Sequence, residues 1–246
     1  MTLNYNIYTH QYKELKMKFR VSTSKEALQE SGGGSSYISK SGIYDVTITF
    51  ASLDVTENGA ESVNFNLDYN GSSQTVYGPY VTNTDGNVNE IGAKLINKLA
   101  VIAGMDDGDT FEIEEETHNV GKDNKPQDFA VITNFTGLPI KIRLQEEYYI
   151  PEKGQNKGNI QKRMVIKNFF RADGAAAEEI VNDSEIGKRL ATEQEKYASN
   201  VTYRNNLTAK DIEAWKAEKS TKTSETTPTP KPSTPAKPKT SGSIFK

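Results

Sequence analysis

The sequence predicts a mainly β protein with a few appended helices and a disordered C-terminal tail. Apolar and polar side chains alternate with a period of two through most of residues 44–81, which is typical of half-buried strands. The period changes to that of a helix over residues 89–104, and further alternating segments follow. From Ser220 onward the chain is rich in Thr, Pro, Lys and Ser, a composition that cannot bury enough apolar surface to fold.

Three strands joined by two short turns form the first part of the predicted fold. The first strand covers residues 44–50 and the second covers 63–69, with Glu57-Asn58-Gly59 as the turn between them. Asn70-Gly71 then turns the chain into a third strand, residues 74–81. Because Asn and Gly tolerate the positive φ angles of tight hairpin turns, we expect an antiparallel meander.

One amphipathic helix follows the meander. Asn89 is a candidate N-cap, and Gly104 stands at the C-terminal end. The apolar face consists of Ile91, Leu95, Leu99 and Ile102. Further strand candidates lie within residues 111–113, 129–132, 139–150 and 164–170. Three meander strands, a helix and then more strands are the order of the five-stranded OB-fold barrel, with a generic α+β sheet as the alternative.

The predicted organisation has four parts. Residues 1–36 are an N-terminal extension with a Gly/Ser joint, and residues 37–182 are the OB-like domain. Residues 183–219 form a polar helical segment, in which Thr208 to Asp211 reads as a capped helix start and Trp215 is the only tryptophan. Residues 220–246 are the disordered tail, which ends with the apolar pair Ile244 and Phe245.

Composition excludes several classes of protein. Cysteine is absent, which excludes disulfides and thiolate metal sites. No apolar run is long enough for a transmembrane helix, and the N-terminus lacks the pattern of a secretory signal. We therefore expect a cytoplasmic protein that does not bind a membrane. The net charge of -3 excludes a uniformly basic surface but leaves room for a polarised one.

The segment from Leu138 to Arg171 opposes the overall charge. It holds eight basic residues against three glutamates, a net charge of +5. Local positive charge attracts phosphates, and aromatic rings stack on unpaired bases. For any single one of these basic residues, the simpler explanation is that it keeps an exposed strand soluble. The candidate phosphate contacts are Lys141, Arg143, Lys157, Lys162, Arg163 and Lys167.

Aromatic residues accompany these charges. Tyr148 and Tyr149 are adjacent on a predicted strand and must point to opposite faces, so only one of them can stack on a base. Tyr77 and Tyr80 flank Gly78-Pro79, where a bend could expose their rings, although packing in the core or at its rim is the competing explanation. The polar loop of residues 155–163 is the most favoured contact point of the segment.

Catalytic motifs are absent from the sequence. Neither a Ser/His/Asp arrangement nor a Walker loop occurs, and His10 and His118 are the only histidines. An acidic run from Asp106 to Glu116 could hold a metal ion for phosphodiester chemistry, but its spacing is typical of a solvated strand face. We expect a protein that is not an enzyme and that needs neither a cofactor nor a metal.

Two blocks of sequence resemble bacteriophage-encoded single-stranded DNA-binding proteins of the OB-fold kind. The first block consists of residues 42–48, 63–65, 77–82 and 99–104, and the second consists of residues 135–149, 165–170 and 177–180. The resemblance implies sequence-tolerant coating of replication or recombination intermediates. It also implies a tail that recruits other replication proteins, here through Ile244 and Phe245. The best-known tails are acidic, whereas residues 216–246 carry seven lysines against two glutamates.

The leading hypothesis is therefore a non-catalytic protein that binds single-stranded DNA through phosphate neutralisation and base stacking. A phage structural or adaptor protein that assembles through its β domain is the alternative. A nuclease that uses the acidic run is a third candidate. The sequence does not separate DNA from RNA, because no contact to a 2′-hydroxyl can be read from composition.

Overall fold

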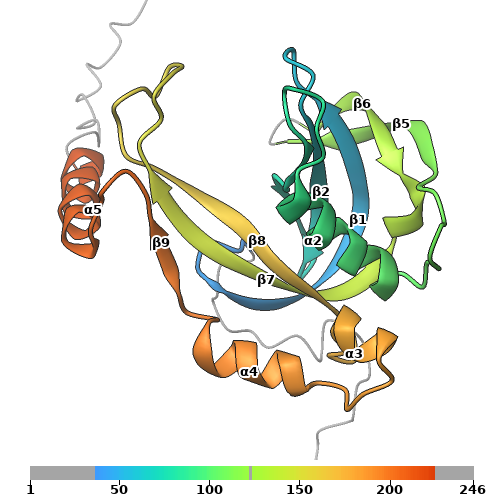
Figure 1. The fold of residues 1–246 in the computed structure, drawn as a ribbon. Helices are drawn as coiled ribbons and strands as arrows, with labels where there is room; N and C mark the ends of the chain where they lie inside the picture. Colours follow the sequence, from blue (N-terminus) through green and yellow to red (C-terminus); the bar gives the residue numbers. More distant parts are fainter. Residues whose placement is uncertain (1–36, 122–123, 225–246) are drawn as a thin grey trace, which may run out of the picture. The chain divides into compact units, whose positions relative to one another are not determined.

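The computed structural model describes residues 37–121 and 124–224, which form a mainly β structure with peripheral helices (Figure 1). The predictions for residues 1–36 and for the tail tip, Ile244 and Phe245, lie outside the described residues. The strands are β1 Gly42–Val55, β2 Glu61–Tyr69, β3 Ser72–Val76, β4 Tyr80–Thr82, β5 Ile113–Val120, β6 Lys125–Ile132, β7 Leu138–Tyr149, β8 Gln161–Arg171 and β9 Val201–Tyr203. The helices are α2 Glu90–Ile102, η1 Thr133–Phe135, α3 Ala177–Val181, α4 Lys188–Lys196 and α5 Ala209–Ser224.

The long strand β1 organises the sheet. One of its edges pairs antiparallel with β2 from Thr47 to Val55. The other edge pairs with β7 from Gly42 to Ile48 and then with β6 at Ser52 and Leu53. The described part of the chain thus forms a single nine-stranded sheet, in which β1 holds together the meander, the β5–β6 hairpin and the β7–β8 hairpin.

The predicted meander is confirmed, with one difference at its first turn. Asn70 and Gly71 both have positive φ angles, 52° and 78°, as a two-residue hairpin turn requires. At the first turn only Gly59 has a positive φ, because β1 ends at Val55 and β2 begins at Glu61, which leaves a longer connection. Here Thr56 closes the loop through hydrogen bonds to Ala60.

The predicted five-stranded barrel is not confirmed, because the described sheet stays open. β3 pairs only with β2, and β8 pairs only with β7. The third predicted strand is broken at Tyr77-Gly78-Pro79, after which β4 pairs again with β2. A Cβ atom on Gly78 would lie 1.7 Å from the backbone oxygen of Val63, so only glycine permits this close approach. The bend ends β3 before it can close a barrel against β8.

The helix α2 has the predicted ends but a rotated face. The side chain of Asn89 accepts a hydrogen bond from the backbone N–H of Gly92 at 3.1 Å, which confirms the N-cap. Leu99 and Ile102 are buried as expected, together with Ile96. Ile91, predicted to face the core, is 85% exposed. The helix rests on Gly92 instead, because a Cβ there would lie 1.8 Å from the backbone oxygen of Tyr80.

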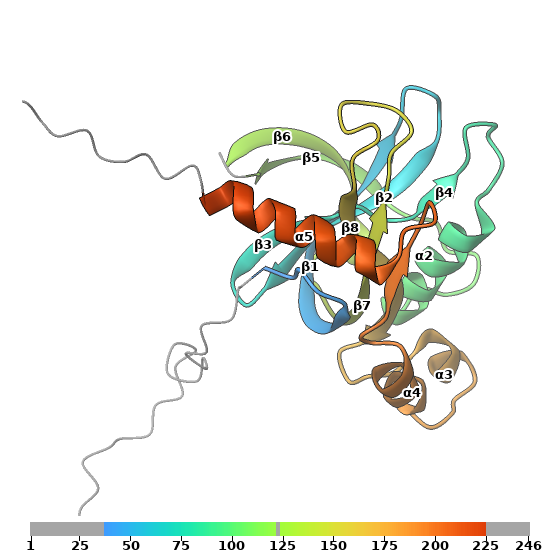
Figure 2. The same ribbon diagram turned by 90° about the vertical axis from the view of Figure 1, so that its left-hand side faces the viewer.

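The C-terminal elements add to the same sheet. β9 pairs in parallel with the end of β7, from Glu146 opposite Val201 to Tyr148 opposite Tyr203. The helix α5 follows (Figure 2), and its start is capped as predicted, since Thr208 and Asp211 bond to each other's backbone N–H groups. None of the described helices is both long and apolar enough to span a bilayer.

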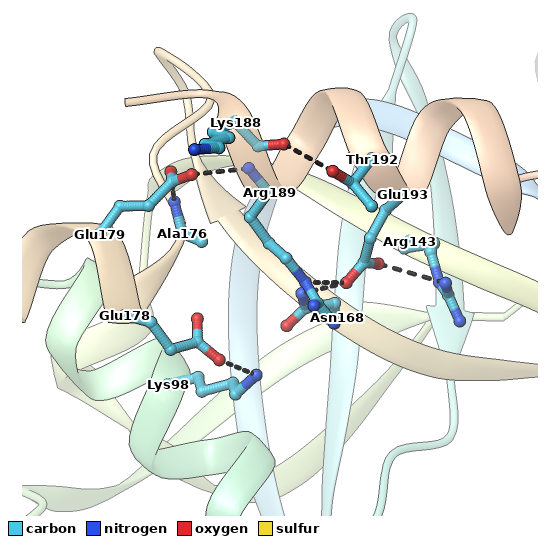
Figure 3. Close-up of polar contacts among 10 residues, drawn as sticks. All are labelled: Lys98, Arg143, Asn168, Ala176, Glu178, Glu179, Lys188, Arg189, Thr192 and Glu193. Atoms are coloured by element: carbon cyan, nitrogen blue, oxygen red, sulfur yellow. Dashed lines mark hydrogen bonds and ion pairs between the residues drawn. The ribbon is translucent and has the colours of Figure 1, made fainter. Parts of the chain in front are cut away.

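Buried polar contacts join α3 to the start of α4 and fasten α4 to the sheet (Figure 3). The carboxylate of Glu179 accepts hydrogen bonds from the backbone N–H groups of Ala176, Gly187 and Arg189. The carboxylate of Glu193 on α4 contacts Arg143 on β7 and Asn168 on β8. These contacts make the segment after residue 182 part of the packing around β7 and β8.

Candidate nucleic-acid interface

A groove of about 1000 Å³ lies where the sheet fails to close. One wall comes from β3, the bend after it and the exposed side of α2, and the other comes from β8. Residues of β1, β2 and the end of β7 also line it, together with the start of the described chain and Arg204, which follows β9. The open strand edges therefore border a cavity that could hold an extended ligand.

The charges in this groove are strongly one-sided. Among the described residues, Asp54 is the only acidic one that lines it, and six basic side chains do so. These six are Lys94, Lys98, Lys162, Arg163, Lys167 and Arg204. A protein with a net charge of -3 thus concentrates positive charge at one concave surface.

Two carboxylates at the end of β7 compensate part of this charge. Glu147 is fully buried (0% exposed) and forms ion pairs with both Arg163 and Arg204. Glu146 forms an ion pair with Lys162 at 3.3 Å, and Lys98 pairs with Glu178. Burial opposes the ionised form of Glu147, but its bonds to Arg204 and Arg163 outweigh burial and hold its pKa below the ordinary value.

Lys94 and Lys167 have no ion-pair partner among the described residues. Burial lowers the pKa of Lys167, and the positive charges of Arg143, Arg204 and Arg163 act in the same direction, partly offset by Glu147. An anion in the groove would relieve this repulsion.

Four tyrosines supply aromatic surface to the groove. Tyr77 and Tyr80 are 76% and 51% exposed, so the bend at Gly78-Pro79 presents both rings to solvent. Tyr37 and Tyr149 also line the groove. The guanidinium of Arg163 lies 4.9 Å from the ring centre of Tyr149, which orients both groups.

Six of the predicted contact residues line the groove: Lys162, Arg163, Lys167, Tyr149, Tyr77 and Tyr80. Lys157 is exposed in the β7–β8 loop but does not line it. Of the two adjacent tyrosines at the end of β7, Tyr149 lines the groove and Tyr148 does not.

The structure corrects three of the predicted contacts. Tyr148 is 1% exposed, because Tyr203 and Trp215 cover its ring, and its hydroxyl donates a hydrogen bond to Glu146 at 2.8 Å. It therefore cannot stack on a base. Arg143 is paired with the buried Glu193. Lys141 is paired with Asp45 on the neighbouring strand, so both cations have structural partners outside the groove.

Four of the basic and aromatic lining residues were not predicted from the sequence. Lys94 and Lys98 are four residues apart and therefore lie on one face of α2. This spacing alone could have predicted that the two lysines face the same surface. Tyr37 and Arg204 gave no local signal, because they reach the groove from opposite ends of the described chain.

The acidic run lies outside the groove lining, in the loop after α2 and on β5. Glu114 and Glu115 are exposed on β5, and His118 stacks on Phe50 with ring centres 4.0 Å apart. The described residues contain no cluster of three or more acidic or histidine side chains arranged to hold a metal ion.

The buried position of Glu147 predicts a pH-dependent contribution to stability. Its folded pKa is below the unfolded value of about 4.3, so folding favours the ionised form. The contribution is complete above that value and is lost as the pH falls through the lower folded pKa. At pH 7, Glu147→Gln should reduce the free energy of unfolding by about 1–3 kcal/mol.

Urea unfolding of the wild type and of Glu147→Gln between pH 7 and pH 3 measures this contribution. The difference between the two proteins should narrow below about pH 4. Glu115→Gln, at an exposed position on β5, is the control and should leave stability nearly unchanged. A difference that stays constant across this range would contradict the assignment.

The sequence matches no model of a known protein family, and no curated protein matches it.

Proposed function

We propose that this protein binds single-stranded DNA in the groove between β3 and β8 and that it is not an enzyme. The observation that carries the proposal is the combination of six basic side chains and four tyrosines in one concave surface. Lysine and arginine neutralise phosphates, and stacking on exposed rings holds bases without reading their sequence. The proposed role is to coat replication or recombination intermediates.

Exposed rings favour a single strand over a duplex. In a duplex the faces of the bases are stacked on one another, whereas in a single strand they are free to lie on Tyr77 and Tyr80. The open groove supports the same choice, since it follows two strand edges and so suits an extended chain.

The order of elements supports a relationship to the OB-fold. The elements β1, β2, β3, α2, β7 and β8 occur in the order of the five strands and one helix of that fold. The short strand β4 before α2 and the β5–β6 hairpin before β7 are additions to this order. In this reading the groove occupies the place where β3 and β8 would meet to close the barrel.

Titration of a fluorescently labelled dT oligonucleotide tests the proposal. If three to six of the lining cations neutralise phosphates, the logarithm of the binding constant should fall with the logarithm of salt concentration with a slope of about -2 to -4. Fluorescence anisotropy at several salt concentrations measures the slope directly.

Two control ligands complete this experiment. A duplex of the same length should bind more weakly, and a peptide nucleic acid of the same sequence, which lacks phosphates, should show no such salt dependence. A salt-independent affinity for the dT oligonucleotide, or an equal affinity for the duplex, would overturn the proposal.

A structural or adaptor role is the second candidate. Within the part of the chain that the structure describes, β3 and β8 each pair on one side only, and an open strand edge can accept a strand from another chain. Size-exclusion chromatography with and without the oligonucleotide separates the two roles. A DNA-independent oligomer that does not bind the oligonucleotide would favour the adaptor.

A further inference from the structure

The strand β8 contains a bulge at Lys167. Asn168 lies opposite Arg143 and Ile166 lies opposite Leu144, so Lys167 is an extra residue without a partner on β7. A bulge changes the direction in which side chains leave a strand, and bulges are frequent beside binding sites. The side chain of Lys167 lines the groove described above.

The charges around this bulge are only partly balanced. Arg163 and Arg204 line the groove together with Lys167. The one buried carboxylate that faces them, Glu147, is shared by both arginines. Three positive charges against one negative charge leave an excess of +2, and Lys167 is half buried without an ion-pair partner among the described residues.

The geometry points to a specific phosphate seat within the groove: Lys167, aimed by the bulge, together with Arg163 and Arg204, binds one backbone phosphate of the strand. This inference rests on the proposed function and adds which residues hold a phosphate most directly. The ammonium supplies a point charge, and each guanidinium can bond a phosphate oxygen while it keeps contact with Glu147.

The seat joins two parts of the chain that are distant in sequence. Lys167 and Arg163 come from β8, whereas Arg204 follows β9 and is placed by the hydrogen bond from its backbone N–H to the backbone oxygen of Tyr148 at 2.9 Å. The C-terminal segment therefore contributes directly to the seat, and a bound phosphate would link β9 to β8.

Charge removal at Lys167 tests the seat. Lys167→Met keeps an unbranched side chain of similar length, and Lys188→Met removes an equal charge at an exposed position on α4 that does not line the groove. Binding of the labelled dT oligonucleotide by the full chain is measured against salt for both variants and the wild type. Lys167→Met should decrease the magnitude of the slope by about 0.7, so its loss of affinity relative to the wild type should be about fivefold larger at 0.1 M salt than at 1 M salt.

The outcomes distinguish the seat from the function as a whole. If the wild type binds with the expected salt dependence but Lys167→Met and Lys188→Met have the same slope against salt, the phosphate seat is wrong and the proposed function still holds. Failure of the wild type to bind overturns the proposed function and the seat with it. Lys167→Arg keeps the positive charge at this position and should therefore keep the salt-dependence slope of the wild type.

Chemical protection of the wild-type protein gives a measurement that does not depend on a variant's folding. The full chain is acetylated with trace acetic anhydride with and without the dT oligonucleotide, and modification of each lysine is read by mass spectrometry. The oligonucleotide should reduce acetylation of Lys167 several-fold more than that of Lys188. Equal reduction at the two lysines would overturn the seat.

Discussion

Replacement of Glu193 by alanine is expected to destabilise the protein by about 3–5 kcal/mol. Glu193 is 2% exposed, and its carboxylate contacts Arg143 at 3.2 Å, Arg189 at 2.8 Å and Asn168 at 2.9 Å. Arg143 is itself largely buried and has no other ion-pair partner among the described residues. The substitution therefore leaves a buried cation uncompensated, which costs far more than the net value of the pair.

Urea unfolding followed by circular dichroism measures this loss. Glu195→Ala is the matched control, since it removes an exposed carboxylate from the same helix and should change the free energy of unfolding by less than about 0.5 kcal/mol. If Glu193→Ala is no more destabilising than the control, α4 does not depend on this contact for its position. Removal of Arg143 as well, as Arg143→Met, should recover part of the loss.

The double substitution Tyr77→Ala with Tyr80→Ala is expected to weaken binding of the dT oligonucleotide at least about thirtyfold, since each stacked ring contributes about 1–3 kcal/mol. Both rings are exposed and line the groove, so their removal takes little from the core. The salt dependence should stay as in the wild type, because no charge changes. Fluorescence anisotropy gives the affinity and the slope in one experiment.

Tyr197→Ala is the control for the two tyrosines. Tyr197 follows α4, where the guanidinium of Arg143 lies 5.5 Å from its ring centre. It is 42% exposed and does not line the groove, so its loss should leave affinity nearly unchanged. Thermal unfolding of the double variant should be close to that of the wild type. Unchanged affinity in the double variant would show that bases do not stack on these rings.

Local patterns predicted much of the fold. The alternation in residues 44–69 placed β1 and β2, and Asn70-Gly71 specified a turn that needs two positive φ angles. Asn89 marked the start of α2 because its side chain satisfies a backbone N–H that the helix cannot. Each of these features is determined within a few residues of sequence, so the sequence alone was sufficient.

The open sheet and the true lining of the groove depended on contacts between distant residues. The barrel prediction failed because Gly78 fits against the backbone of Val63, which directs β4 back to β2. Arg143 was assigned to phosphate because nothing near it in sequence indicated Glu193, fifty positions later. Tyr148 was a candidate for base stacking because its covering residues are distant in sequence. Tyr203 and Trp215 lie in the segment of residues 183–219, which the sequence predicts as separate from the β domain.

The parallel pairing of β9 with β7 has a consequence for the order of folding. Glu146 and Val201 are joined across 55 residues, and Trp215 must reach Tyr148 across still more. Contacts between such distant positions form late in folding. Closing the long loop between them costs conformational entropy before the new contacts can offset that cost. During synthesis the meander and the β7–β8 hairpin leave the ribosome before β9 and α5. We therefore expect the Arg204 side of the groove to form after the β8 side.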